Sequence, residues 1–378
     1  MKTSKNKCLV AILFLTFGVL FIGVFIVVGI LFFNEKTIVV DGGFIQDAVD
    51  EADPGDIILV KASGGPYEEE VTINKDNIKL IGIGKEKPIL NGTGMVGVGI
   101  TINNPGAMVQ NFIIQNFATA IRAFDADGHM IKGNNVKDNG LVGLFIDNSD
   151  NNVIKENTVT DNGNDGIFLA SSVNNMIKEN SVKGNEQGML LNNESSKNII
   201  KGNIVNSNTN EGIRLEESSS SNMIKGNTVN DNNFGISLSN STSNMINRNT
   251  INENGQDGIF LISSTNNMMT GNRVKDNGDE GILLSTSDSN IVKGNTVNDN
   301  GQGILLNNVA SNNIIKGNKV NNNVTDGIQL TGTTNNNDVF FNRAFGNGAL
   351  PFFDIENFGT NNFKGNKCDT SNQPNICN

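Results

Sequence analysis

The sequence predicts an all-β protein: a single-stranded, right-handed parallel β-helix solenoid of about 11 coils, with an N-terminal capping helix and an N-terminal transmembrane helix. Three observations lead to this prediction. A motif of about 23 residues recurs along most of the 378-residue chain, asparagines recur at fixed spacing within each copy, and the segments between them are too short for helices. Three short strands per copy, stacked at about 4.8 Å, give such a solenoid.

The repeat is marked by a glycine that opens a strand of the form G-Φ-x-Φ, in which Φ is an apolar residue. Successive side chains of a strand point to opposite faces, so we expect Φ in the core and x outside. A degenerate copy begins at Ala120. The other copies begin at Gly143, Gly166, Gly188, Gly212, Gly235, Gly258, Gly281, Gly303 and Gly327.

Each copy also carries asparagines in the pattern N-x4-N-x4-N, as at Asn152, Asn157 and Asn162. An Ile or Val lies between successive asparagines, as expected for short strands that alternate inward and outward. Inward asparagines at the bends can bond the asparagines of the next coil and the bend backbone. We therefore assign them a structural rather than a catalytic role.

Both ends of the stack expose strand edges and must be covered. Residues 44–52 have the apolar spacing of a short amphipathic helix, which stops at Asp53-Pro54-Gly55 and is predicted to cap the front. Cys368 and Cys377 are predicted to form a disulfide near the C-terminus, where an oxidising compartment would preserve it. An apolar plug is predicted before them, from Phe345, Phe352, Phe353, Phe358 and Phe363.

Residues 8–33 form an apolar stretch without a charged residue. It is longer than the roughly 7–15 residues of a signal-peptide core and meets the roughly 20 that a spanning helix needs. Three lysines precede it, which favours a cytoplasmic N-terminus. We predict an uncleaved anchor in the membrane that places residues 34–378 outside the cytoplasm, at the cell surface or in the periplasm. A removed signal peptide is the alternative.

The predicted organisation is a cytoplasmic stub and transmembrane anchor at 1–33, an N-terminal cap with the first coils at 34–98, regular coils at 99–343 and a C-terminal cap at 344–378. The chain has a net charge of −11, and its lysine-containing first 33 residues hold no acid. An acidic surface argues against nucleic acid as a partner, because phosphate binding needs clustered basic charge. We expect a monomer.

The opening VDGGFIQDAVDEADPGDIILVKASGGPYEEEVTINKDNIKLIGIG is followed by coils of the form N-x-I-x-x-N-x-V-x-x-N-x-x-x-G-I-x-L. This arrangement resembles the NosD-like branch of the pectin-lyase-type β-helix proteins, over residues from about 37 to 370. The resemblance implies the β-helix fold. It leaves the activity open, because that scaffold carries lyases, hydrolases, epimerases, binding modules and a copper-site assembly factor.

Polar residues that could carry chemistry gather where the repeat is least regular, between Ala120 and Asp150. Asp127 and Asp150 each fall seven residues into their copies, so we expect them to stack about 5 Å apart. Such carboxylates could share a proton or bind Ca²⁺. His129, the only histidine, also stands at an asparagine position, so a role at the bend is the alternative. The candidate catalytic residues are Asp125, Asp127, Asp147, Asp150, Arg122 and His129.

Four further sets of residues could bind a partner or a metal. Outward methionines share one register with Val and Ile, which favours packing over a Cu(I) site: Met130, Met176, Met223, Met245 and Met268. A row of lysines could follow an anionic cell-wall polymer: Lys132, Lys155, Lys178, Lys201, Lys225, Lys293 and Lys316. Acids before the glycine strands could collect Ca²⁺ weakly: Asp165, Asp257, Asp279, Glu280 and Asp326. A second polar cluster holds Arg214, Glu216 and Glu217.

Three functions stay open, in order of preference. The first is a non-catalytic surface protein that binds a polysaccharide or a protein partner along the rod. The second is a carbohydrate-active lyase, hydrolase or epimerase that uses the acids near His129. The third is a NosD-like copper-delivery or maturation factor. The metal-ligating residues are not identified by the sequence; Ca²⁺ is favoured over copper as a cofactor.

Overall fold

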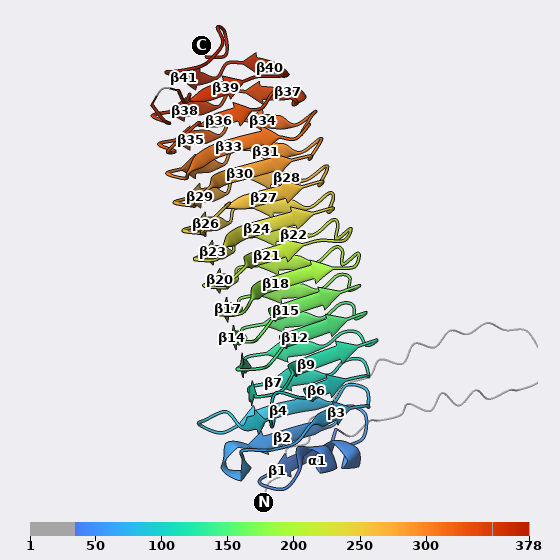
Figure 1. The fold of residues 1–378 in the computed structure, drawn as a ribbon. Coiled ribbons are helices and arrows are strands. Elements are labelled where there is room, and N and C mark those ends of the chain that lie inside the picture. The colour runs from blue at the N-terminus through green and yellow to red at the C-terminus, as the bar shows by residue number, and fades with distance from the viewer. Residues whose placement is uncertain (1–34, 350, 378) are drawn as a thin grey trace, which may run out of the picture. The chain divides into compact units, whose positions relative to one another are not determined.

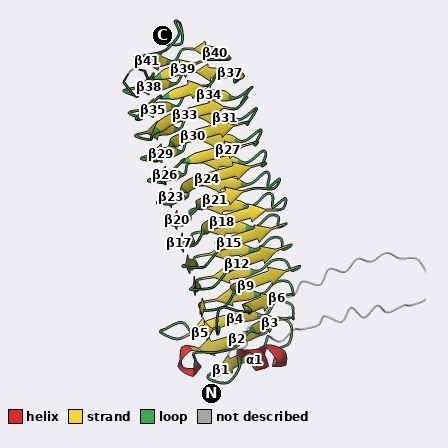
Figure 2. Ribbon diagram, viewed as in Figure 1, coloured by secondary structure: helices red, strands yellow, loops and turns green. Residues whose placement is uncertain are grey.

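The computed structural model describes residues 35–349 and 351–377. These residues form one continuous parallel β-helix, in which the chain visits three sheets in turn (Figures 1 and 2). Sheets A, B and C hold 15, 13 and 13 strands, so the solenoid has about 14 turns.

Sheet A consists of β1 (Thr37–Val40), β2 (Ile57–Lys61), β4 (Lys79–Ile83), β7 (Met108–Gln110), β10 (Met130–Lys132), β13 (Val153–Lys155), β16 (Met176–Lys178), β19 (Ile199–Lys201), β22 (Met223–Lys225), β25 (Met245–Asn247), β28 (Met268–Thr270), β31 (Ile291–Lys293), β34 (Ile314–Lys316), β37 (Asn335–Phe340) and β40 (Thr360–Lys364). Sheet B consists of β5 (Ile89–Asn91), β8 (Ile113–Gln115), β11 (Asn135–Lys137), β14 (Thr158–Thr160), β17 (Ser181–Lys183), β20 (Ile204–Asn206), β23 (Thr228–Asn230), β26 (Thr250–Asn252), β29 (Arg273–Lys275), β32 (Thr296–Asn298), β35 (Lys319–Asn321), β38 (Arg343–Phe345) and β41 (Lys367–Cys368). Sheet C, which holds the glycine strands, consists of β3 (Val71–Ile73), β6 (Val98–Ile102), β9 (Thr119–Phe124), β12 (Val142–Asp147), β15 (Asp165–Ala170), β18 (Gln187–Asn192), β21 (Glu211–Leu215), β24 (Phe234–Ser239), β27 (Ile259–Ile262), β30 (Glu280–Ser285), β33 (Gln302–Asn307), β36 (Ile328–Leu330) and β39 (Ile355–Asn357).

The prediction of about 11 coils was too low. The first coils, before Ala120, lack the N-x4-N-x4-N asparagine pattern, yet they stack in register with the regular ones: Ile58 pairs with Leu80, and Leu80 pairs with Val109. All three side chains are fully buried. Alternating apolar residues are therefore sufficient to build a coil, and counting the signature alone missed these turns.

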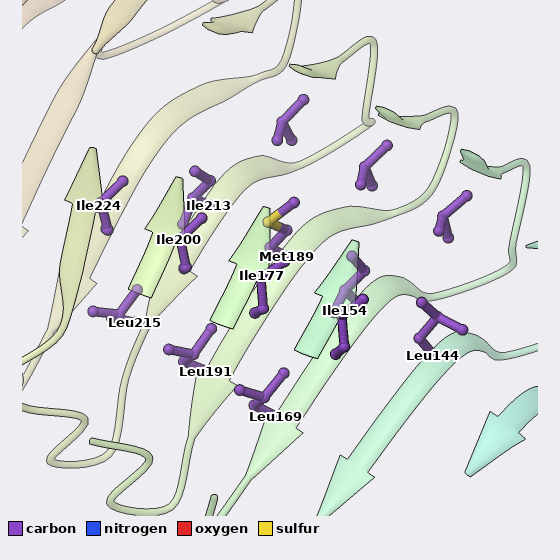
Figure 3. Close-up of a cluster of buried hydrophobic side chains, with 14 of the residues drawn as sticks. Leu144, Ile154, Leu169, Ile177, Met189, Leu191, Ile200, Ile213, Leu215 and Ile224 are labelled. Carbon is purple, nitrogen blue, oxygen red and sulfur yellow. The ribbon is translucent and has the colours of Figure 1, made fainter. Parts of the chain in front are cut away.

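The core is a stack of aliphatic side chains, each resting on its equivalents in the coils above and below. Ile154, Ile177 and Ile200 from sheet A lie near Leu169 and Leu191 from sheet C (Figure 3), and all five are fully buried. Each buried side chain of this size contributes roughly 1.5–3 kcal/mol.

The glycine of the repeat is required by close packing inside the coil. A Cβ atom on Gly166 would lie 2.5 Å from Cγ1 of Val182 and 2.7 Å from the carbonyl oxygen of Gly188. Neither neighbour can withdraw, because Val182 fills the core and Gly188 belongs to the adjacent strand. The same crowding at equivalent positions explains why the motif recurs.

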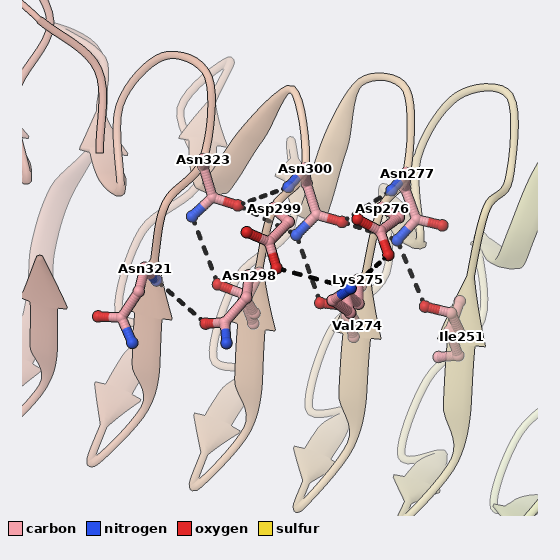
Figure 4. A network of polar contacts seen from close by, with 11 residues as sticks. Ile251, Val274, Lys275, Asp276, Asn277, Asn298, Asp299, Asn300, Asn321 and Asn323 are labelled. Carbon is pink, nitrogen blue, oxygen red and sulfur yellow. Dashed lines mark hydrogen bonds and ion pairs between the residues drawn. The ribbon is translucent and has the colours of Figure 1, made fainter. Parts of the chain in front are cut away.

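The asparagines form continuous ladders at the three bends. The Oδ1 atom of Asn180 accepts hydrogen bonds from the backbone N–H and the side-chain amide of Asn157, at 2.9 and 3.0 Å. Its own amide donates to the carbonyl oxygen of Ile154 and to Oδ1 of Asn203, both at 3.0 Å. Figure 4 shows a second ladder, which includes Asn300. These bonds give the asparagines the structural role that their spacing predicts.

Helix α1 (Ile45–Glu51) covers the front end, and a 3₁₀ turn, η1 (Ala62–Gly64), follows β2. Ile45 and Val49 are fully buried, whereas Phe44 stays 61% exposed. The cap therefore begins one residue later than the apolar pattern indicated.

The C-terminal end is closed differently from the predicted apolar plug. Phe352 and Phe358 are exposed, at 38% and 59%, so this part of the prediction was wrong. The carboxylate of Asp354 instead accepts the amides of Asn347 and the N–H groups of Asp369 and Thr370. The predicted disulfide between Cys368 and Cys377 is present in the structure, with 5.4 Å between their Cα atoms.

Within residues 35–349 and 351–377, no helix is long and apolar enough to cross a membrane. The predicted anchor at residues 8–33 lies outside the described part of the chain.

We predict that Asn180→Ala lowers the free energy of unfolding by about 3 kcal/mol, because the change leaves several buried polar groups unpaired, each at a cost of roughly 1–3 kcal/mol. The midpoint of urea denaturation measures the effect. Asn164→Ala is the control, because Asn164 is exposed and makes no ladder bond. Equal midpoints for the two variants would contradict the role of the ladder.

Candidate functional site

The outward residues of sheet C form straight columns because the strands pair in register. The central column holds the x residue of each glycine strand, as the repeat predicted: Arg122, Phe145, Phe168, Leu190, Arg214, Ser237, Phe260, Leu283, Leu305 and Gln329. A second column, the pre-glycine column, holds the residue before each glycine. Any ligand that lies on sheet C meets these two columns.

The structure brings two of the predicted catalytic residues together. Nη2 of Arg122, on β9, donates to Oδ2 of Asp147, at the end of β12, over 2.7 Å. The guanidinium also lies 4.6 Å from the ring centre of Phe124 and 5.3 Å from that of Phe145. Phe145 stacks on Phe168 with 4.7 Å between ring centres. The result is an arginine held against a short aromatic strip.

The three other predicted aspartates lie in the turns that follow these strands. Oδ1 of Asp127 accepts the backbone N–H of Asp150 at 2.7 Å, and Oδ1 of Asp150 accepts that of Val173 at 2.6 Å. Asp125, whose φ is 51°, accepts a hydrogen bond from the side chain of Asn148. Asp127 and Asp150 are thus stacked one coil apart, and each holds the turn of the next coil.

His129 lies inside the solenoid, where it begins an asparagine ladder. Its side chain is 1% exposed, and Nδ1 accepts the backbone N–H of Ala107 at 3.2 Å. The backbone N–H of His129 donates to Oδ1 of Asn152 at 2.7 Å. Burial lowers the pKa of His129 below its usual range, so the ring is neutral at pH 7. This is the bend position that the asparagine pattern offered as the alternative.

A more concentrated group of polar residues lies two to four coils further along sheet C. We call it the acidic patch, and it consists of Asp165, Gln187, Asn192, Glu211, Arg214 and Glu216. Asp165 on β15 pairs with Gln187 on β18, and Glu211 follows in the same column on β21. Nη1 of Arg214 donates to Oε1 of Glu211 at 3.2 Å, while Nη2 donates to Oε2 of Glu216.

The surroundings of Asp165 raise the pKa of its carboxyl group. Only 8% of the residue is exposed, and this burial, aided by the negative charges of Glu186 and Glu216, raises its pKa to about 7. Arg214 opposes the shift, but its guanidinium is paired with Glu211 and Glu216. Asp165 can therefore give or take a proton near neutral pH, next to carboxylates whose charge is compensated by an arginine.

Two hollows flank the acidic patch, one at each end of the same strands. The hollow beyond the strand ends has a volume of ≈ 730 Å³ and includes Ser171, Asn193 and Glu217 in its lining. The hollow before the strands has a volume of ≈ 520 Å³ and is lined in part by Asp161 and Glu186. An extended ligand that lies along β15, β18 or β21, from the start of the strand to its end, would reach both hollows.

A second acidic group lies further along sheet C. Asp257 is 4% exposed, its Oδ1 accepts the backbone N–H of Glu280 at 2.9 Å, and burial together with Glu280 raises its pKa to about 8. In the last coils Gln329 donates to Asp326 and to Glu356. The residues named in these two groups include no arginine, and amide groups donate to their carboxylates.

Sheet A carries the methionine and lysine columns in the predicted register. Met223, Met245 and Met268 lie on adjacent strands, and Met108 pairs with Met130 to extend the column. Among residues 35–349 and 351–377, no group of three or more His, Cys, Asp or Glu side chains is arranged to hold a metal ion. The copper and Ca²⁺ hypotheses stay predictions.

The sequence identified half of the acidic patch. Asp165 was noted as a turn acid, and Arg214 and Glu216 were noted as a separate cluster. Glu211, Gln187 and Asn192 were missed. The available signal was the residue that precedes each glycine, because the copies at Gly166, Gly188 and Gly212 have Asp, Gln and Glu at this position.

Family comparisons agree with the fold. Residues 98–251 match the model described as a right handed beta helix region, and residues 217–372 match the model described as periplasmic copper-binding protein (NosD). The chain therefore contains a right-handed β-helix region and a region similar to NosD. No curated protein sequence matches this β-helix protein.

Solved structures share the fold of this protein at low sequence identity. The mannuronan C-5 epimerase AlgE4 A-module of Azotobacter vinelandii is 13% identical with a TM-score of 0.58, over 88% of this chain and 95% of that one. The GH87 alpha-1,3-glucanase of Streptomyces thermodiastaticus is 14% identical with a TM-score of 0.56, over 89% and 69%. Pectate lyase Pel9A is 15% identical with a TM-score of 0.53, over 75% and 80%.

We predict that His129→Asn removes a pH-dependent loss of stability. Because the pKa of His129 is lowered in the folded state, the unfolded chain binds a proton more readily, and the wild type loses stability as pH falls through about 6.5. Asparagine does not titrate and fits the ladder. Urea midpoints at pH 8 and pH 5 measure the effect. The midpoint of the variant relative to that of the wild type should be higher at pH 5 than at pH 8. A difference that does not change with pH would refute a buried neutral histidine.

Proposed function

We propose that this NosD-like protein works outside the cytoplasm and binds a polysaccharide across sheet C, at the acidic patch. One observation carries the proposal: Asp165 and Glu211, two coils apart in one column, are nine-tenths buried on the outer face of the solenoid, between two hollows. The other outward positions of the pre-glycine column include Val98, Thr119 and Val142, which show that the fold does not require acids there.

The acidic patch lowers the stability of the folded protein. A carboxyl group that leaves water without full compensation is destabilised, which the raised pKa of Asp165 reports. Such arrangements concentrate at functional sites, where a ligand completes the pairing. Carboxylate, amide and guanidinium groups on one face of a sheet also suit the hydroxyl groups of sugars, which both donate and accept hydrogen bonds.

Three further observations support the proposal. The β-helix structures of similar fold are named for enzymes of polysaccharides, namely a mannuronan epimerase, an alpha-1,3-glucanase and a pectate lyase. The family model that matches residues 217–372 describes a periplasmic protein, and a disulfide closes the C-terminal end. Both fit a compartment outside the cytoplasm, as does the predicted anchor at residues 8–33.

Isothermal titration with a panel of oligosaccharides tests the binding. Arg214→Ala should change the affinity for the best ligand at least about tenfold, because the change removes the guanidinium that holds the carboxylates of Glu211 and Glu216 in place. Arg273→Ala is the matched control, since Arg273 is exposed on sheet B, away from the acidic patch. The proposal fails if no glycan of the panel binds or if both variants bind like the wild type.

A second candidate function is cleavage of the bound glycan by acid–base catalysis, favoured by the pKa of Asp165 near 7. Protonated Asp165 would donate its proton to the glycosidic oxygen, while Glu211 would take a proton from the water that attacks the anomeric carbon. The two residues stand two coils apart in one column, which places their backbones about 10 Å apart. This separation is on the scale of the roughly 6.5–9.5 Å between the carboxyl groups of inverting glycosidases.

Cleavage is measured as release of reducing ends from the bound glycan. The rate should fall as pH rises above about 7, because the general acid loses its proton. Asp165→Asn should reduce the rate at least about 100-fold and keep the binding, whereas Asp231→Asn, in an exposed turn, should not affect the rate. Undiminished cleavage by Asp165→Asn, or no cleavage of any bound glycan, rejects this candidate.

A further inference from the structure

Several buried acceptor atoms of the acidic patch have no donor. Oε2 of Glu211, Oε1 of Gln187 and Oδ1 of Asn192 are buried and find no hydrogen-bond partner in residues 35–349 and 351–377. Glu211 is 8% exposed, and its other oxygen is bonded to Arg214. Buried acceptors are nearly always paired in folded proteins, so three orphans on two neighbouring strands indicate a ligand that brings donors.

The orphan acceptors lie at both ends of one strand. Gln187 opens β18 and Asn192 closes it, about 16 Å apart along an extended strand. Glu211 lies one coil on from Gln187, and Glu216, whose N–H donates to the carbonyl oxygen of Leu191, lies one coil on from Asn192. Leu190 stands between the two ends. The acceptors thus flank an apolar centre, with the spacing of a short oligomer rather than of a single sugar.

The charge of the patch decides what kind of donor fits. Four carboxyl groups, those of Asp165, Glu186, Glu211 and Glu216, act on this region, and Arg214 is the guanidinium among them. Both ends of that guanidinium are already bonded to Glu211 and Glu216. A uronate or sulfate group would therefore meet negative charge without a free cationic donor, whereas an ammonium group would meet attraction.

We infer that the glycan bound at the acidic patch is an amino-sugar polymer, whose ammonium groups donate to the orphan acceptors of Glu211, Gln187 and Asn192. The inference rests on the proposed function and names its ligand class. Hydroxyl groups of neutral sugars also donate, so a neutral glycan binds more weakly rather than not at all. An ammonium group adds up to three donors and the charge that the carboxylates lack.

Isothermal titration of the full-length protein separates the ligand classes. The probes are oligomers of β-1,4-linked glucosamine and of α-1,4-linked galactosamine, their N-acetylated counterparts, and oligogalacturonate, all at one pH and ionic strength. At least one amino-sugar oligomer should bind about tenfold more tightly than its N-acetylated counterpart. Oligogalacturonate should show no binding. An acetylated or acidic oligomer that binds as tightly as the amino-sugar oligomers overturns the inference and leaves glycan binding intact, whereas no binding of any oligomer overturns both.

A variant that removes one negative charge from the acidic patch tests where the ammonium group binds. Glu211→Gln keeps the shape of the side chain and removes its charge, so the advantage of the amino-sugar oligomer over its acetylated counterpart should fall to about threefold or less. Glu280→Gln is the control, because Glu280 stands in the same pre-glycine column three coils away and outside the acidic patch. An advantage that survives in Glu211→Gln, or that is lost equally in Glu280→Gln, refutes recognition at the patch.

Discussion

The asparagine ladders are the interaction on which the rest of the structure depends. Most ladder side chains bond both the backbone and the side chain of the equivalent asparagine one coil away, as Asn157, Asn180 and Asn203 show. A slip of one coil against the next by even one residue would break all of these bonds at once and expose the core. The ladders therefore fix the register of the coils that carry them, and the stacked aliphatic core of those coils follows from that register.

Because the register is fixed, equivalent outward residues of successive copies form columns on the surface, and the copies differ in these residues. Asp165 and Glu211 are 46 positions apart in the sequence, yet they occupy one column two coils apart, because the coil between them pairs in register with both neighbours. The bends and the core tolerate little variation, whereas outward positions tolerate much. Polar and charged residues can therefore occupy outward positions of sheet C without disturbing the fold. They do so at the acidic patch and, in a smaller group, at Arg122 and Asp147.

The predictions from sequence were most accurate where a residue's role depends on its own copy of the repeat. The glycine strands, the outward central column and the disulfide of Cys368 with Cys377 were all predicted correctly. The count of coils was too low because the first coils use apolar alternation without the asparagine pattern. His129 could be placed at a ladder position by counting, but its burial and its bond to Ala107 required the neighbouring coil.

The sequence by itself determined the parallel β-helix, its three bends per coil and the faces on which most side chains lie, because these follow from a short repeat and the geometry of strands. Only the tertiary structure decided that Asp165 and Glu211 are nearly buried and that Arg214 bridges Glu211 and Glu216. It also decided that three acceptors of the patch find no donor within the part of the chain that the structure describes. Those properties depend on which side chains from neighbouring coils contact one another. Such contacts determine how far a side chain is shielded from solvent and which hydrogen bonds it forms, and no single copy of the repeat specifies them.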